Sequence, residues 1–344
     1  MKIVHQFMTV LGVGRIALQL IQVVVSMLSI INNNFLQMQR LVLLFMGLLT
    51  VMSSCVSSNK KIDTSILNSK LINKELFLGL PIQILKEDKY LLINDFRMDP
   101  MISIVDSTGH IIKKVLRKGR GAMEALPPLH LVSSKDSLFI FDRNSCKLYS
   151  LLKDSLWSLQ FRMNYISQFP SSINMITKIS STKYLASGIF DEARFAFVNS
   201  SGKIIKFFGD YPSFMRGETN IPLRGKGMFH QTFFLHNVEK KLIAAVTSHV
   251  LDIYSFDDSN LELKLINRVL ISPYKYTCRI DNVLCATFSD DTKRGMIDCC
   301  TKDKFIYILF SQRSNNNEKD LCEILKYDWM GNLIHKYKLV DGIA

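Results

Sequence analysis

The stretch VDSTGHIIK at residues 105–113 recurs with little change as VNSSGKIIK at 198–206 and as YDWMGNLIH at 327–335. In each copy an Asp or Asn opens the turn, a Gly stands three residues later, and apolar residues follow. Asp and Asn side chains bond to the backbone of tight turns, and Gly readily adopts the left-handed conformation that such turns require. Each copy therefore predicts a β-hairpin. Two further polar turns are expected at Lys153–Ser155 and Asp257–Asn260.

The five turns are spaced almost regularly along the chain. Their first acidic or amide residues, Asp106, Asp154, Asn199, Asp257 and Asp328, are 48, 45, 58 and 71 residues apart. A repeat of roughly 45 residues made of four strands is typical of a propeller blade. We therefore predict a β-propeller in which the two longer intervals carry insertions.

Short β-rich runs bounded by Asp, Asn, Ser or Gly fill each repeat, and beyond residue 70 no apolar stretch keeps a helical period. The fold class is therefore all-β, with four-stranded blades. The third, fourth and fifth repeats predict strands at 175–179, 183–189, 194–198 and 203–208, at 231–235, 242–247, 251–256 and 261–270, and at 295–300, 305–310, 321–327 and 333–339.

The ends of the propeller are less regular than its middle. The first repeat begins near Pro81, and Leu71–Phe77 precedes it as a lone strand that would suit the outer edge of a last blade. Five repeats end at Leu339, and residues 340–344 are too few for three more strands. We expect an incomplete sixth blade in a truncated reading frame, and the alternative is a five-bladed ring.

A targeting segment precedes the repeats. Arg40 is followed by the apolar run LVLLFMGLLTVM at 41–52 and then by Ser53, Ser54 and Cys55. A short basic start, an apolar run too short to span a bilayer and small residues at its end are typical of a secretory signal. We predict that Cys55 becomes the lipidated N-terminus, and the alternative is an ordinary signal peptide with an incidental cysteine.

These features divide the chain into four parts. Residues 1–37 precede the signal and are expected to be either translated upstream sequence or a helix outside the fold. Residues 38–54 form the predicted lipoprotein signal, residues 55–69 a polar tether, and residues 70–344 the propeller. Such a protein would be lipid-anchored in the cell envelope, at the outer membrane and facing the periplasm.

The propeller part is strongly basic. The chain has 43 Lys and Arg against 30 Asp and Glu, and residues 1–54 hold three of the basic residues and no acidic one, so the rest carries 40 − 30 = +10. A domain with this charge favours anionic partners. Zinc-finger spacing and RNA-binding signatures are missing, so we do not expect a nucleic-acid partner.

Together these motifs resemble the TolB-like six-bladed β-propeller lipoproteins of Gram-negative bacteria. The resemblance spans roughly residues 55–340 and includes the lipobox, the blade repeat and the segment GRGAMEALP at 119–127, which is similar to a linker of that family. In that linker Ala122 and Met123 stand where Pro and Gly are expected. The resemblance implies a fold and a lipid anchor, and it implies no catalytic residues.

Sequence motifs for catalysis or cofactors are missing. No C-x-x-C, H-x-x-x-H, H-E-x-x-H, G-x-S-x-G or phosphate-binding Gly loop occurs in the propeller part, so we predict no cofactor and no metal site. The adjacent Cys299 and Cys300 should point to opposite faces of a strand. Cys278 and Cys285 could form a disulfide, although free thiols are favoured.

The arginines suggest where binding takes place. In a propeller, the loops between the second and third strands of each blade and the connections between blades lie on one face. We predict that this face holds a partner-binding set, which consists of Arg97, Arg143, Arg194, Arg120 and Arg313. Further arginines are expected there at 117, 216, 224, 279 and 294, with Tyr211, Tyr274 and Tyr276. Arg and Tyr are enriched at binding surfaces.

Two function classes follow from this reading. We favour a non-catalytic binding or scaffold module whose partner is an unknown envelope protein or an anionic glycan, with the membrane contacted through the N-terminal lipid. The alternative is a propeller hydrolase or lyase with its site in the central funnel. A ring of His and carboxylates on the innermost strands would favour the enzyme, and the predicted innermost strands are poor in both.

Overall fold

The fold is taken from a computed structural model, which describes residues 62–68, 73, 76–134, 136–158, 161–280, 284–317 and 322–340. The predicted extension, the signal segment and Cys55 lie outside the described residues. Most of the expected lone strand at 71–77 and the last four residues lie outside them too. In the described part, no helix is long and apolar enough to cross a membrane.

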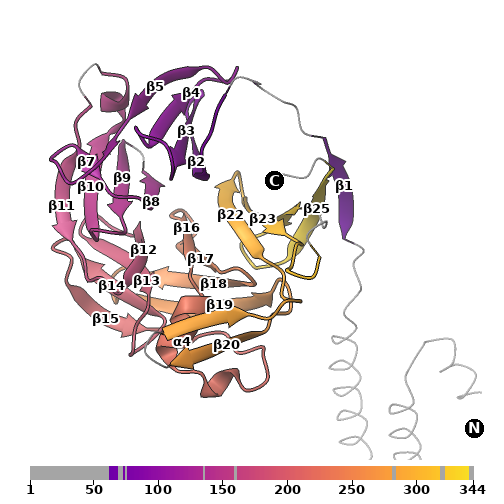
Figure 1. The fold of residues 1–344 in the computed structure, drawn as a ribbon. Coiled ribbons are helices and arrows are strands. Elements are labelled where there is room, and N and C mark those ends of the chain that lie inside the picture. Colours follow the sequence, from indigo (N-terminus) through magenta and orange to yellow (C-terminus); the bar gives the residue numbers. More distant parts are fainter. Residues whose placement is uncertain are drawn as a thin grey trace, which may run out of the picture. The chain divides into compact units, whose positions relative to one another are not determined.

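The described strands form five blades that follow one another around a common centre (Figure 1). Blade 1 contains β2 (Pro81–Glu87), β3 (Tyr90–Asp95), β4 (Ile102–Val105) and β5 (Ile111–Val115). Blade 2 contains β8 (Leu129–Ser133), β9 (Ser137–Asp142), β10 (Lys147–Leu152) and β11 (Asn164–Gln168). Blade 3 contains β12 (Ile173–Lys178), β13 (Lys183–Gly188), β14 (Phe195–Asn199) and β15 (Ile204–Phe208).

The remaining two blades complete the described propeller. Blade 4 contains β16 (Phe233–Asn237), β17 (Leu242–Val246), β18 (Val250–Asp257) and β19 (Glu262–Leu270). Blade 5 contains β22 (Gly295–Lys302), β23 (Phe305–Ser311), β24 (Cys322–Tyr327) and β25 (Leu333–Leu339). The predicted all-β propeller of four-stranded units is therefore confirmed, and the predicted strands of the last three repeats agree closely with these blades.

Blades 2, 3 and 4 are buried on both faces because a neighbouring blade packs against each face. In β9, Leu138 and Ile140 belong to the apolar cluster shared with blade 1, whereas Phe139 and Phe141 belong to the cluster shared with blade 3. Successive side chains of a strand point to opposite faces, so a strand between two blades needs apolar residues at every position. This requirement explains runs such as the Leu138–Phe141 segment.

The recurrent turns adopt the expected conformation. Gly109, Gly202 and Gly331 all have φ near +83°, in the left-handed region. In the first turn, the Asp106 carboxylate accepts a hydrogen bond from the Thr108 N–H at 2.8 Å. The turns join the third and fourth strands of blades 1, 3 and 5, as the repeats predict.

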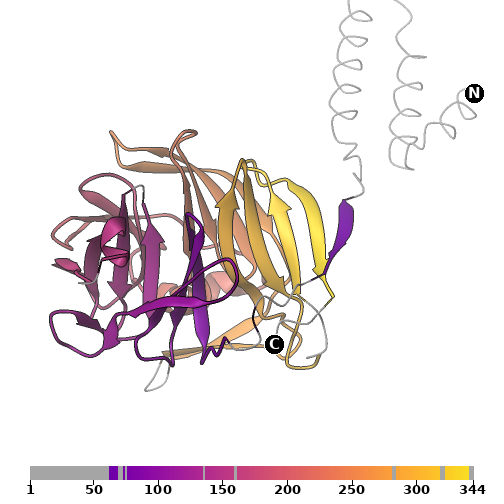
Figure 2. The same cartoon turned by 90° about the horizontal axis from the view of Figure 1, so that it is seen from above.

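One strand lies where the sequence did not indicate it. β1 (Asp63–Leu67) pairs in parallel with β25, and its register places Ser65 opposite Tyr337. It forms the outer edge of blade 5 and gives that sheet a fifth strand (Figure 2). An added edge strand was expected at 71–77. The strand that extends the C-terminal blade instead comes from within the segment expected to be a tether, residues 55–69. β1 is mostly exposed and is held by backbone pairing, which leaves no apolar pattern to recognise.

The cysteine predictions can be compared with the β-hairpin formed by β20 (Tyr276–Ile280) and β21 (Leu284–Phe288). Cys278 lies opposite Ala286, and Arg279 lies opposite Cys285. Cross-strand partners share a face, so the two cysteines point to opposite faces of the hairpin, and both thiols are free. The disulfide that the sequence left open is therefore not formed.

Candidate functional site

The second-to-third-strand loops and the connections between blades meet on one face of the propeller, which we call the loop face. The Lys118 ammonium, in the connection after blade 1, donates to the Arg97 carbonyl at 3.0 Å. The Asn144 side-chain amide, in the loop after β9, donates to the Pro127 carbonyl at 3.0 Å. These contacts tie the two kinds of loop together, as the propeller reading of the sequence expects.

Two buried aspartates at the ends of second strands hold this face in place. Asp95 is fully buried, and its carboxylate accepts hydrogen bonds from the backbone N–H groups of Gly79 at 2.7 Å, Leu80 at 2.8 Å, Arg97 at 3.0 Å and Met98 at 3.2 Å. Burial alone would raise the pKa of this carboxyl, but the four donors outweigh it and the pKa lies below its ordinary value.

Asp142 plays the same part in blade 2. Its carboxylate accepts from the N–H groups of Leu126 at 2.7 Å and Ser145 at 2.8 Å. An arginine follows each aspartate closely, Arg97 two residues after Asp95 and Arg143 directly after Asp142. The two carboxylates therefore fix the backbone from which the side chains of Arg97 and Arg143 project.

Four of the five predicted arginines are accessible on loop-face segments. Arg97 and Arg120 are exposed, and Arg143 and Arg313 are half-buried. Partial burial lowers the pKa of the Arg143 guanidinium below its usual range. Among the residues that the structure describes, no hydrogen-bonding or ionic partner contacts the guanidinium groups of Arg97, Arg120 or Arg143.

Arg194 is a correction to the predicted set. Its side chain is 1% exposed and forms an ion pair with the fully buried Asp252. Arg268 reaches the same carboxylate, with Nε 2.8 Å from Oδ1. Arg194 therefore cannot meet a partner at the surface, because its loop is covered by the two insertions.

These insertions, the connections from blade 3 to blade 4 and from blade 4 to blade 5, pack together, and we call them the cap. The first carries the 3-10 helix η2 (Glu218–Asn220) and α4 (Leu223–Phe229), and the second is the β20–β21 hairpin. Two buried glycines bring α4 close to its neighbours. A Cβ at Gly225 would lie 2.4 Å from Cys278 Sγ, and one at Gly227 would lie 2.8 Å from the Gly188 carbonyl oxygen.

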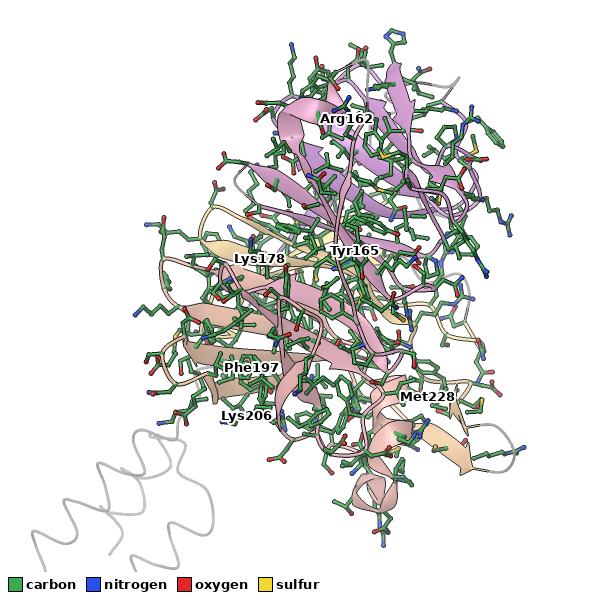
Figure 3. The ribbon with its side chains drawn as sticks, turned by 90° about the vertical axis from the view of Figure 1, so that its left-hand side faces the viewer. Arg162, Tyr165, Lys178, Phe197, Lys206 and Met228 are labelled. Carbon is green, nitrogen blue, oxygen red and sulfur yellow. The ribbon has the colours of Figure 1, made fainter. Side chains whose placement is uncertain are left out.

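Figure 3 shows on which side of blade 3 the cap lies. Met228 of α4 is on the right in that view, and Lys178, at the far end of β12, is on the left. Lys178 ends β12 and precedes the turn between the first two strands of the blade, which lies on the face opposite to the loop face. The cap therefore covers the loop face and not the opposite one.

A buried carboxylate organises the cap. Glu218 is 0% exposed and accepts hydrogen bonds from His230 Nε2 at 2.9 Å, Tyr274 Oη at 2.9 Å and Tyr276 Oη at 3.0 Å. The backbone N–H groups of residues 214 and 215 also donate to it. Burial raises the pKa of Glu218, but these donors outweigh the effect and hold its pKa below the ordinary value.

The predicted loop tyrosines belong to this buried part and not to an exposed surface. Tyr211, Tyr274 and Tyr276 are 8%, 6% and 3% exposed. Their pKa values are raised, first by burial, and for Tyr274 and Tyr276 also by the negative charge of Glu218. Glu218 itself has no local sequence signature, and only the long repeat intervals pointed to structured insertions.

The innermost strands line the central funnel, where a hydrolase or lyase would have its site. His130 of β8 meets Phe233 of β16 edge to face, with ring centroids 5.9 Å apart, and desolvation lowers its pKa to about 4. Asp298 of β22 has a raised pKa because it is desolvated. In the described ranges, no group of three His, Cys, Asp or Glu side chains is placed to hold a metal ion.

The family model TolB-like 6-blade propeller-like matches residues 59–344. No curated protein matches the chain. Similar solved structures include a "putative exported protein" of Bacteroides fragilis, with 14% identity, coverage of 80% of this chain and 79% of that chain, and a TM-score of 0.45.

Two further solved structures are similar at the same level. The periplasmic gluconolactonase PpgL of Pseudomonas aeruginosa shares 12% identity, with 72% and 66% of the two chains covered and a TM-score of 0.38. A member of the DUF4221 family from Bacteroides vulgatus shares 10% identity, with 76% and 82% covered and a TM-score of 0.43. Likenesses this distant carry no argument about activity.

Proposed function

The chain belongs to the TolB-like 6-blade propeller-like family, and from this premise we propose that it is a lipid-anchored, extracytoplasmic propeller that binds an acidic protein or an anionic glycan at its loop face. The observation that carries the proposal is the state of Arg97, Arg120 and Arg143. All three leave loop-face segments, and their guanidinium groups have no protein partner among the described residues.

Arg143 is the most informative of the three. Partial burial of a guanidinium without a counter-charge costs free energy, and the lowered pKa of Arg143 reflects that cost. A carboxylate or sulfate of a partner would supply the missing charge and accept two parallel hydrogen bonds from the planar group. The net charge of +10 outside residues 1–54 would also speed the approach of such a partner.

Two matched triple variants test the binding face. Replacing Arg97, Arg120 and Arg143 by Gln should weaken binding to immobilised poly-glutamate or heparin more than tenfold in low salt, because three charge-assisted contacts are lost. The control replaces the exposed Lys114, Lys203 and Lys206, on outer strands and turns, by Gln and removes the same charge. Equal losses in both triples would show that binding follows net charge alone. The two resins distinguish an acidic protein from an acidic glycan.

The proposed address rests on the segment before the propeller. The apolar run at 41–52 and Cys55 behind two small residues favour export and acylation at sulfur. Metabolic labelling with a fatty acid should mark the wild-type protein and leave Cys55→Ala unmarked. Equal labelling of both proteins would contradict the anchor while leaving the binding proposal intact.

A further inference from the structure

Several polar atoms under the cap are buried without a partner. They are Arg194 Nε and Nη2, Tyr211 Oη and His230 Nδ1. The three side chains are 1%, 8% and 2% exposed, so bulk water does not satisfy them. A buried polar atom that forms no hydrogen bond costs about 1–3 kcal/mol. Such atoms normally have a ligand or an ordered water molecule beside them.

The side chains that carry these atoms come from three segments and lie near one another. The ring centroids of Tyr211 and His230 are 5.9 Å apart. Arg194, in the loop before β14, is near enough for its charge to lower the pKa of both residues, although burial remains the larger influence on each. The backbone of α4 also comes close to this point, because a Cβ at Gly227 would stand 2.9 Å from Tyr211 Oη.

The open donors around this point favour a group with several acceptor oxygens. Arg194 and Arg268 share the carboxylate of Asp252, and the second buried carboxylate, Glu218, is already bonded to its own five donors. Two N–H groups of Arg194 and the Tyr211 hydroxyl are donors in need of acceptors. An oxyanion supplies several acceptor oxygens in one small group.

His230 adds a requirement of its own. Glu218 is a carboxylate that accepts from His230 Nε2, so the neutral imidazole carries its proton there and Nδ1 is an acceptor. A ligand that fits all the open atoms therefore needs oxygens to accept from Arg194 and Tyr211 and a hydroxyl to donate to His230. We propose that Arg194, Tyr211 and His230 form an enclosed site for a small oxyanion that bears a hydroxyl group.

This site is separate from the loop-face arginines, since Arg194 is buried and the loop-face triple is accessible. Hydrogenphosphate and glycolate have the required hydroxyl, whereas sulfate and acetate present similar oxygens without it. We expect phosphate and glycolate to raise the melting temperature of the full chain saturably at constant ionic strength, and each to exceed its hydroxyl-free counterpart. The stronger ligand of the two distinguishes a phosphate from a carboxylate site.

Tyr211→Phe removes one open hydroxyl and keeps the ring. It should weaken binding of the preferred anion about tenfold in calorimetric titration, as should Arg194→Lys, which keeps the charge and loses the fork. The matched control Tyr327→Phe changes an equally buried tyrosine in blade 5 and should leave binding unchanged. Stabilisation that rises linearly with every salt, or that Tyr211→Phe does not alter, would overturn the proposal and assign these atoms to water.

Discussion

Replacing Asp252 with asparagine is expected to lower the free energy of unfolding by about 3–5 kcal/mol. Asp252 is fully buried and is the carboxylate partner of both Arg194 and Arg268. An amide of the same shape fills the space but leaves the buried Arg194 guanidinium without a counter-charge. Urea unfolding at neutral pH, followed by tryptophan fluorescence, measures the change.

The surface pair of Lys183 and Asp258 supplies the control. Its nitrogen and oxygen are 3.6 Å apart, and the two side chains are 30% and 55% exposed. Asp258→Asn makes the same chemical change and should cost less than about 1 kcal/mol, because solvent already screens the pair. Similar losses in the two variants would contradict the assignment of Asp252 as the ionic centre beneath the cap.

Acidification should weaken the protein through His249. The side chain is 0% exposed, lies with its ring centroid 5.9 Å from that of Phe229, and has no partner on either ring nitrogen. Desolvation, with smaller contributions from the neighbouring His230 and Lys293, lowers its pKa to about 4. Tyr274 stacks on the same ring.

The direction of this pH effect follows from the pKa values of His249 in the unfolded and the folded chain. The unfolded chain takes up a proton near pH 6.5, whereas folded His249 stays neutral down to about pH 4. The contribution of neutral His249 to the free energy of unfolding is therefore fully present above pH 6.5. It is lost as the pH drops toward 4, by about 3 kcal/mol. His230, whose pKa is also lowered by burial, adds to the loss in the same direction.

The measurement is the free energy of unfolding at several pH values between 7 and 4 for wild type and for His249→Phe. Phenylalanine keeps the stacked ring and has no group to protonate. The free energy of unfolding of the variant should therefore depend clearly less on pH than that of the wild type. His110→Gln, which changes an exposed histidine, should keep the wild-type slope. A slope unchanged in His249→Phe would show that this ring is not held neutral by the fold.

Much of the fold could be predicted because it repeats. The turn at Asp106 and its copies depends on local chemistry, and the residues that set it are adjacent in sequence. Blade strands have apolar residues on both faces, so they too are visible locally. β1 escaped prediction because an exposed edge strand is held by its backbone partner β25 and not by its own side chains.

The candidate site was predictable only in part. Loop arginines such as Arg97 and Arg143 follow from their place in the repeat. The burial of Arg194 does not, because it depends on two insertions that meet only in the folded chain. Glu218 and its tyrosine donors come from different insertions, so no spacing in the sequence links them.

Arginine-selective modification with phenylglyoxal, read by mass spectrometry with and without poly-glutamate, shows whether the accessible loop-face arginines bind an anionic partner. Poly-glutamate should slow the modification of Arg97, Arg120 and Arg143. It should leave unchanged that of Arg162, an exposed residue in the connection before β11. Equal protection of Arg162, or no protection of the other three, would contradict binding at the loop-face arginines.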